Sequence, residues 1–319
     1  MKRILSISLA LFFTACTNNS DVEPVAVHRY DYAIMSLPAD NPDSIGVALN
    51  LYADEYWVFL QGADLDDTNN IRQIQQFITD TQIIAVYKRI QSEYPVESTK
   101  LGTELAKAFS NIRNIFPQFK DPNVYTYISY FDALNRITYF DSILWIGLDL
   151  YVSNNTEQYS SFGIPQYLSA RLSPDYLMPD IVRAAGRQLI ARKQETTLLD
   201  NIVEEGKMMC FISSVLPGTK EYILFGYTPG EWAWCKRNES KIWEYLAKEN
   251  LLYQTDPVRI RRFINDGPGG LALEGAPSRL TQFIGWRLVS RYLDNTDDNW
   301  GLLFESGTQE VLNVSKYKP

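Results

Sequence analysis

Histidine is nearly absent from this sequence. The 319 residues contain only one, His28, in a polar, turn-rich segment near the N-terminus. Serine and cysteine hydrolase triads use imidazole as the base, and the zinc helix of many peptidases uses two imidazoles as ligands. Neither arrangement is available here, so we expect no catalytic residues of these kinds, no metal and no other cofactor.

Cysteine is also scarce. Of the three, Cys16 belongs to the N-terminal region, whereas Cys210 and Cys235 lie among apolar residues in segments with a helical pattern. Export would permit a disulfide, but apolar surroundings suit buried free thiols equally well. The sequence leaves both alternatives open.

Positive charge is the third deficit. Thirty Lys and Arg face 38 Asp and Glu, which gives a formal charge of −8, and no basic cluster stands out. Lys and Arg supply most of the affinity of nucleic-acid-binding proteins, so we expect no nucleic-acid partner. The composition is 45% hydrophobic and 13% aromatic, which is typical of a globular protein.

The N-terminus has the pattern of an export signal. Lys2 and Arg3 precede a mostly apolar run, Ile4–Phe13, which is too short for a membrane helix of roughly 20 residues. Thr14-Ala15-Cys16 then resembles the lipobox of bacterial lipoproteins. We expect a signal peptide at 1–15, a lipidated Cys16 that attaches the mature chain to a membrane, and a flexible tether at 16–30. A plain secretory signal is the alternative.

Residues 31–319 are expected to form a single, mainly α (α+β) domain. Apolar residues recur at helical spacing in 48–61, 71–91 and 101–116. Between them and the later helices, three segments rich in Val, Ile, Thr and aromatics indicate a small, mostly antiparallel sheet: 123–131, 136–140 and 142–152. The later helices have clear start signals, namely Ser173-Pro174, with Pro179 as a restart, Thr197 with Asp200, Thr228 with Glu231, and Asp256-Pro257.

The helix beginning after Thr197 carries an unusual acidic pair, Glu204 and Glu205. Positions three and four apart share a helix face, which places Glu205 on the apolar side and Glu204 toward solvent. A buried carboxylate needs a metal, a cation or a hydrogen-bond donor. Gly206 follows directly and lets another backbone approach closely. The pattern resembles the third-ligand helix of a zinc peptidase.

The preceding helix has arginines where such a peptidase has histidines. In the register Val182–Leu189, Arg183 and Arg187 occupy the two ligand positions and Ala184 occupies the position of the general base. A guanidinium stays protonated and has no lone pair for a metal. An ion pair with Glu205 is one interpretation of these arginines, and a solvated face is the other.

Several long stretches resemble the gliding-motility lipoprotein family GldB of the Bacteroidetes. They are 163–183, 197–218, 226–256, 283–295 and the closing 315–319. The resemblance implies a zincin-like fold without its His-Glu-x-x-His motif, a place in the cell envelope facing the periplasm, on either membrane, and partners in gliding or type IX secretion. Residue by residue, it covers only Cys16 and the Glu205 position.

Together these observations favour a non-catalytic pseudo-peptidase that serves as a scaffold. The strand 142–152 is the expected place for a bound peptide or partner segment, by edge pairing. Trp232, Trp234 and Trp243 fit a recognition surface or a buried core. An exported hydrolase with a histidine-free site is the alternative, and a purely structural lipoprotein is a third hypothesis.

Overall fold

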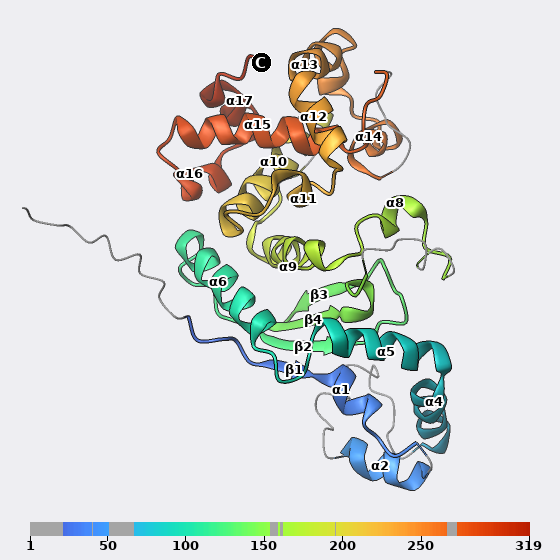
Figure 1. Cartoon of the computed structure of the whole chain (residues 1–319). Helices are drawn as coiled ribbons and strands as arrows, with labels where there is room; N and C mark the ends of the chain where they lie inside the picture. The colour runs from blue at the N-terminus through green and yellow to red at the C-terminus, as the bar shows by residue number, and fades with distance from the viewer. Residues whose placement is uncertain are drawn as a thin grey trace, which may run out of the picture.

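The computed structural model describes residues 22–39, 41–50, 67–153, 159, 162–194, 196–266 and 273–319. The predicted signal peptide, Cys16 and most of the predicted helix 48–61 lie outside the described residues. Figure 1 shows a predominantly helical molecule with one small sheet near its middle. The mainly α fold class is therefore confirmed.

In the chain, β1 comes first and is followed by the described helices α1 to α6. Strands β2, β3 and β4 come next, and the described helices from α8 onward follow them (Figure 1). The strands are β1 (Val27–Arg29), β2 (Asn123–Tyr127), β3 (Ile137–Phe140) and β4 (Ile143–Gly147). The described helices are α1 (Tyr30–Met35), α2 (Pro42–Asn50), α4 (Thr68–Thr79), α5 (Thr81–Glu93), α6 (Lys100–Ile115), α8 (Gln166–Ser169), α9 (Pro174–Leu189), α10 (Leu198–Val215), α11 (Glu221–Leu224), α12 (Pro229–Arg237), α13 (Glu239–Lys248), α14 (Pro257–Ile264), α15 (Leu280–Asp294), α16 (Trp300–Glu305) and α17 (Thr308–Ser315).

The sheet is mixed rather than mostly antiparallel, with strand order β1-β2-β4-β3. β1 and β4 both pair with β2 in parallel, and only β3 and β4 are antiparallel. Those two strands form a hairpin through Asp141 and Ser142, which have φ values of 48° and 64°, as a tight hairpin turn requires. The expectation was wrong because residue composition reveals strands but not their direction or neighbours.

The expected tether, 16–30, ends in a strand. Val27–Arg29 form β1 at one edge of the sheet, so these residues belong to the folded body. The Arg29 Nη2 atom lies 2.7 Å from the buried Asp31 carboxylate, and the Thr126 hydroxyl donates to the same carboxylate from β2 at 2.5 Å. Charge pairing and backbone hydrogen bonds thus attach a polar segment that lacks the apolar pattern of a strand.

Alternating side chains of the central strands face two separate cores, as period-two geometry requires. Val124, Leu144 and Ile146 point into the large core formed with α5–α17. Trp145 points the other way, into a smaller cluster with α1, α2 and α4 that includes Tyr30. The sheet therefore separates the N-terminal helices from the rest of the molecule.

Two predicted helix boundaries were wrong. The segment 71–91 is two helices, because Asp80 adopts an extended conformation and caps α5 by accepting hydrogen bonds from the N–H groups of Gln82 and Ile83. Conversely, Pro179 lies inside the continuous helix α9 rather than restarting it. The capping boxes at Thr197–Asp200 and Thr228–Glu231 are both present, and these predictions are confirmed.

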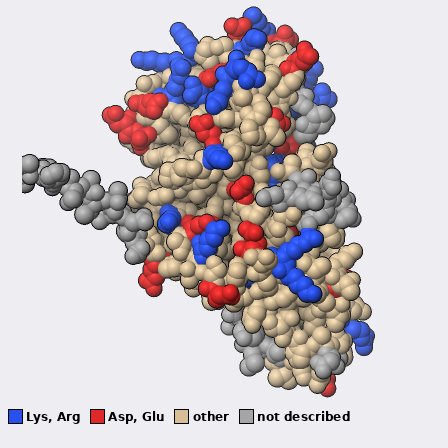
Figure 2. Space-filling view, viewed as in Figure 1, with Lys and Arg blue, Asp and Glu red and all other residues tan. Residues whose placement is uncertain are grey.

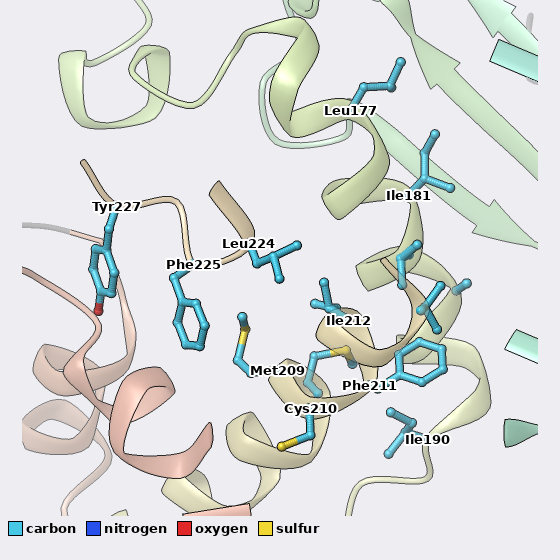
Figure 3. Packing of buried hydrophobic residues seen from close by; sticks show 14 of the residues in the cluster. Leu177, Ile181, Ile190, Met209, Cys210, Phe211, Ile212, Leu224, Phe225 and Tyr227 are labelled. Atoms are coloured by element: carbon cyan, nitrogen blue, oxygen red, sulfur yellow. The ribbon is translucent and has the colours of Figure 1, made fainter. Parts of the chain in front are cut away.

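Helix α10 lies at the centre of the large core, and 15 of its 18 residues are buried. Figure 3 shows Met209 and Ile212 facing Leu224 and Phe225, while Phe211 lies toward Ile190. On another side α15 packs along α10. None of the described helices is long and apolar enough to cross a membrane.

Gly206 and Gly285 let α10 and α15 touch. A Cβ atom added at Gly206 would lie 2.3 Å from the Gly285 carbonyl oxygen, and one at Gly285 would lie 2.0 Å from the Ile202 carbonyl oxygen. Both neighbours are backbone atoms that cannot rotate away. The close approach that Gly206 suggests in the sequence is therefore present, and α15 is the helix that makes it.

Candidate functional site

A cleft of about 460 Å³ opens beside α9 and α10, and we call it the arginine cleft. Its walls come from α8, α9, α10, α11, the start of α15 and the loop before β3. Its charged lining residues are Arg136, Arg171, Arg183, Arg187, Arg192, Arg279, Asp180, Glu205 and Asp266. A larger cleft of about 890 Å³ lies near the N-terminal segment, but its four basic and four acidic lining residues balance.

Glu205 contributes its carboxylate to the arginine cleft. Only 9% of the residue is exposed. Arg192 Nη2 donates to Oε1 at 3.2 Å, and Gln282 Nε2 donates to Oε2 at 3.2 Å. Arg183 Nη1 lies 4.0 Å from Oε2. The expected burial of Glu205 is therefore observed. Its hydrogen-bond and ion-pair partners come from α9, from α15 and from the segment that follows α9.

Arg183 is a half-buried guanidinium with weak acceptors. Burial lowers its pKa to about 10, although the charges of Glu205 and Asp180 act in the opposite direction. Its Nη2 donates to the Met209 sulfur at 3.1 Å, and a thioether is a poor acceptor. No carboxylate oxygen among the described residues lies within hydrogen-bonding distance of Arg183.

Arg187, one turn further along α9, is exposed and lines the same cleft. It forms no ion pair with Glu205 among the described contacts. The structure thus brings Arg183 and Glu205 together but leaves Arg187 apart from them. The sequence did not predict Arg192 and Gln282 as partners of Glu205, because neither residue lies on the same helix as Glu205 or at a characteristic spacing from it.

Glu204 is buried, contrary to its expected position in solvent. It is 5% exposed, and Lys207 Nζ lies 2.8 Å from its Oε1 atom. The same ammonium donates to the Ser306 carbonyl oxygen at 3.1 Å. The expectation failed because α10 is surrounded by other helices, so its polar side is covered as well as its apolar side.

A second arginine group, Arg171 and Arg279, also lines the cleft. Arg171 and Arg279 share one carboxylate, Asp266, with Arg279 Nε 2.6 Å from Oδ1. Burial lowers the pKa of Arg171, and the nearby charge of Arg279 lowers it further, whereas Asp266 opposes the shift. Arg279 also donates to the carbonyl oxygens of Phe225 and Gly226. Two guanidinium groups on one carboxylate leave a local excess of positive charge.

Arg136 is by contrast fully paired. It makes two hydrogen bonds to Asp180, at 2.7 and 3.1 Å, and one to the Ala133 carbonyl oxygen. Tyr151 donates to the same Asp180 carboxylate at 2.8 Å. Burial would raise the pKa of Asp180, but the charge and hydrogen bonds of Arg136 hold it below its usual value. This group forms a neutral wall of the cleft.

The loop between β2 and β3 forms part of the rim. Tyr130 and Phe131 both have positive φ, 58° and 62°, a conformation that costs non-glycine residues about 1–3 kcal/mol each. The buried Asp149 carboxylate holds the loop by accepting hydrogen bonds from the backbone N–H groups of Ser129 and Phe131. The loop thereby places Leu134, 83% exposed, at the cleft.

The Glu205 position does not fit a divalent metal ion. Guanidinium groups cannot coordinate a metal, and two arginines and an amide already surround the carboxylate. Within the described ranges, no group of three His, Cys, Asp or Glu side chains is placed to hold a metal ion. His28 lies on β1, stacked on Tyr125 with ring centroids 4.8 Å apart, and does not line the cleft.

Other candidates from the sequence lie in the core or in the sheet. Cys210 and Cys235 are buried free thiols. Trp232 is buried, with Trp234 and Trp243 packed partly buried against the same core. The strand within 142–152 cannot pair with a peptide at an edge, because β4 already lies between β2 and β3. That part of the expectation was wrong.

Comparison with known proteins gives one informative match. No curated protein and no solved structure matches the chain. A family model described as gliding motility protein GldB matches residues 15–319, which include every element of the arginine cleft. With nearly the whole sequence matched, the chain belongs to the gliding motility protein GldB family.

Proposed function

We propose that this protein is a lipid-anchored component of the cell envelope that acts without catalysis, as a scaffold for a partner in gliding or type IX secretion. Family membership supports the association with gliding motility. The export signal and Cys16 support the lipid anchor. The arginine cleft offers the concave, polar surface that a binding role requires.

The strongest support for a non-catalytic role is the way in which the Glu205 carboxylate is paired. A catalytic carboxylate must be available to a substrate, a water molecule or a metal. Here Arg192 and Gln282 hold one oxygen each, and Arg183 adds a second positive charge. Such a carboxylate organises arginines rather than abstracting protons, which supports a site that binds.

Catalysis is tested on the full chain, extracted from membranes in a non-ionic detergent. We expect metal analysis to find no stoichiometric zinc and a broad peptidase assay to find no turnover that a chelator or Glu205→Gln abolishes. Stoichiometric zinc, or cleavage lost in Glu205→Gln, would support the exported hydrolase instead.

Scaffolding is tested by site-specific photocrosslinking in intact cells. A crosslinker at Leu134, on the rim of the cleft, should capture a gliding or secretion component. The same group at Val47, equally suited by its 68% exposure but located on α2, is the matched control. A purely structural lipoprotein predicts no reproducible partner at either position.

The lipid anchor is tested separately. Cys16→Ser should release the protein from the membrane fraction.

A further inference from the structure

The arginine cleft has a charge opposite to that of the chain. Six arginines and three carboxylates line it, an excess of three positive charges among the described residues. The whole chain carries −8. Figure 2 shows Lys and Arg interspersed with Asp and Glu over the face in view. A local excess of guanidinium groups in an acidic protein indicates a ligand that carries negative charge.

Internal pairing accounts for only part of this charge. Asp266 is shared by two arginines, and Glu205 is shared by Arg183 and Arg192. Arg187 adds a charge with no ion pair to the described acids of the cleft. Buried charges are costly unless they are paired and hydrogen-bonded. Among the described residues, the half-buried Arg183 has only a thioether acceptor and a carboxylate 4.0 Å away, so it favours an additional acceptor.

We infer that the arginine cleft captures the C-terminal carboxylate of a partner polypeptide, with Arg183 and Arg187 contacting the carboxylate. Guanidinium groups bind carboxylates through paired, charge-assisted hydrogen bonds. A chain end can enter a compact cleft of about 460 Å³ end-on, whereas an internal acidic residue would have to bring chain in from both directions. This inference rests on the proposed scaffold role.

The rim supports a peptide rather than a free inorganic anion. Leu134 and Tyr167 are apolar or aromatic side chains exposed at the cleft, 83% and 50% respectively. They lie among the lining residues together with the arginines. Apolar contacts beside a cationic group suit a terminal carboxylate with its neighbouring side chain, because both parts of the ligand then find a partner.

The test uses the full chain in detergent and a pool of tetrapeptides of randomised sequence, prepared once as free acids and once as C-terminal amides. We expect the protein to retain the free-acid pool about tenfold better than the amide pool. Equal retention of both pools, or retention of neither, would overturn the inference. Inorganic phosphate at the same concentration should not displace the acids, and full displacement would indicate a general anion site.

The variants separate the cleft from the rest of the protein. Arg183→Gln and Arg187→Gln should each reduce retention of the free acids by about three- to tenfold. Arg113 lies on α6 and forms an exposed ion pair with Asp121. Arg113→Gln is therefore the matched control and should leave retention unchanged. Because Arg187 is exposed, its variant should fold normally even if Arg183→Gln does not.

The outcomes also distinguish this inference from the proposed function. Loss of acid selectivity with Leu134 crosslinking intact would reject the carboxylate but leave the scaffold. Zinc-dependent cleavage of the pool would reject the scaffold itself, whichever pool is cleaved. Unchanged selectivity in both arginine variants would place the binding outside the arginine cleft and overturn the inference.

Discussion

Two adjacent glutamates of α10 lead into different regions of the molecule. Glu204 points into a closed interior, where Lys207, 1% exposed, and the Ser306 carbonyl oxygen complete the contact. Glu205 points into the arginine cleft, where cationic groups outnumber it. Both carboxylates are buried, so burial alone does not separate a structural charge from a functional one.

The number of charged partners distinguishes Glu204 from Glu205. The Glu204–Lys207 pair is one to one and lies on one helix, three residues apart, so the pair is neutral. The partners of Glu205 come from α9, the segment after it and α15, and the region keeps surplus charge. A balanced pair serves packing, whereas a surplus facing a cleft is available for a ligand.

The largest effect is expected in the closed interior. Lys207→Met would leave the Glu204 carboxylate buried and unpaired, and such a change costs about 3–5 kcal/mol of unfolding free energy. Urea unfolding measures it. The double variant Glu204→Met with Lys207→Met should recover most of the loss, because an apolar pair can replace a buried ion pair. A small loss in Lys207→Met would mean that water reaches Glu204.

The glycine contact underlies both regions because it fixes α15 against α10. Gly206→Ala would place Cβ against the Gly285 carbonyl oxygen, and we expect a loss of about 3 kcal/mol. Gly301→Ala on α16 is the control, since its Cβ would meet nothing closer than 3.7 Å. Equal melting temperatures for the two variants would show that the helices can separate without cost.

On the cleft side, Glu205→Gln removes the charge that Arg183 and Arg192 share. We expect a loss of about 1–3 kcal/mol in urea unfolding, less than for Lys207→Met, since the cleft admits water. A melting curve identical to that of the wild type would contradict the ion pair. A loss larger than that of Lys207→Met would reverse the comparison between the two regions.

Alkaline pH provides a probe of the closed interior. Burial raises the pKa of the Cys210 thiol to about 12 from a usual 9.0. Its folded pKa lies above its unfolded pKa, so the stability it contributes is complete below pH 9 and declines as pH rises toward 12. Between pH 9 and 10, Cys210→Ala should therefore lose less stability than the wild type, by up to about 1.4 kcal/mol per pH unit. Parallel curves would contradict this.

The smallest change in stability is expected for Arg187→Gln. Substitutions at exposed sites without special contacts usually stay within about 0.5 kcal/mol, and Arg187 is exposed. Thermal unfolding should be unchanged although the carboxylate retention falls. A clear destabilisation would assign Arg187 to structure and weaken its role in the cleft.

Local chemistry made much of the fold predictable. Caps such as Thr197–Asp200 depend on residues three apart, so a sequence pattern reveals them directly. Three strands were also predicted from local composition, because Val, Ile, Thr and aromatic residues are concentrated in them. Their pairing was not predicted, since β2 and β4 are neighbours in space but not in the chain. The break at Asp80 was also missed, because the apolar spacing continues across it.

The candidate site divides in the same way. Burial of Glu205 and the close approach at Gly206 followed from helix periodicity and from the lack of a Cβ atom. Arg183 as a neighbour followed only from the comparison of two helices in a peptidase-like register. Arg192, Gln282 and the pair Arg171–Arg279 could not be predicted, since no spacing connects them to Glu205.

By itself the sequence determined that the chain carries a single imidazole, that Asp and Glu outnumber Lys and Arg, and where most helices begin. These properties depend on residue counts and on contacts within one turn. Only the tertiary structure decided that Glu204 is interior, that β4 is central and that six arginines converge on one cleft. Those outcomes depend on how helices and strands from distant parts of the chain pack, which local periodicity does not encode.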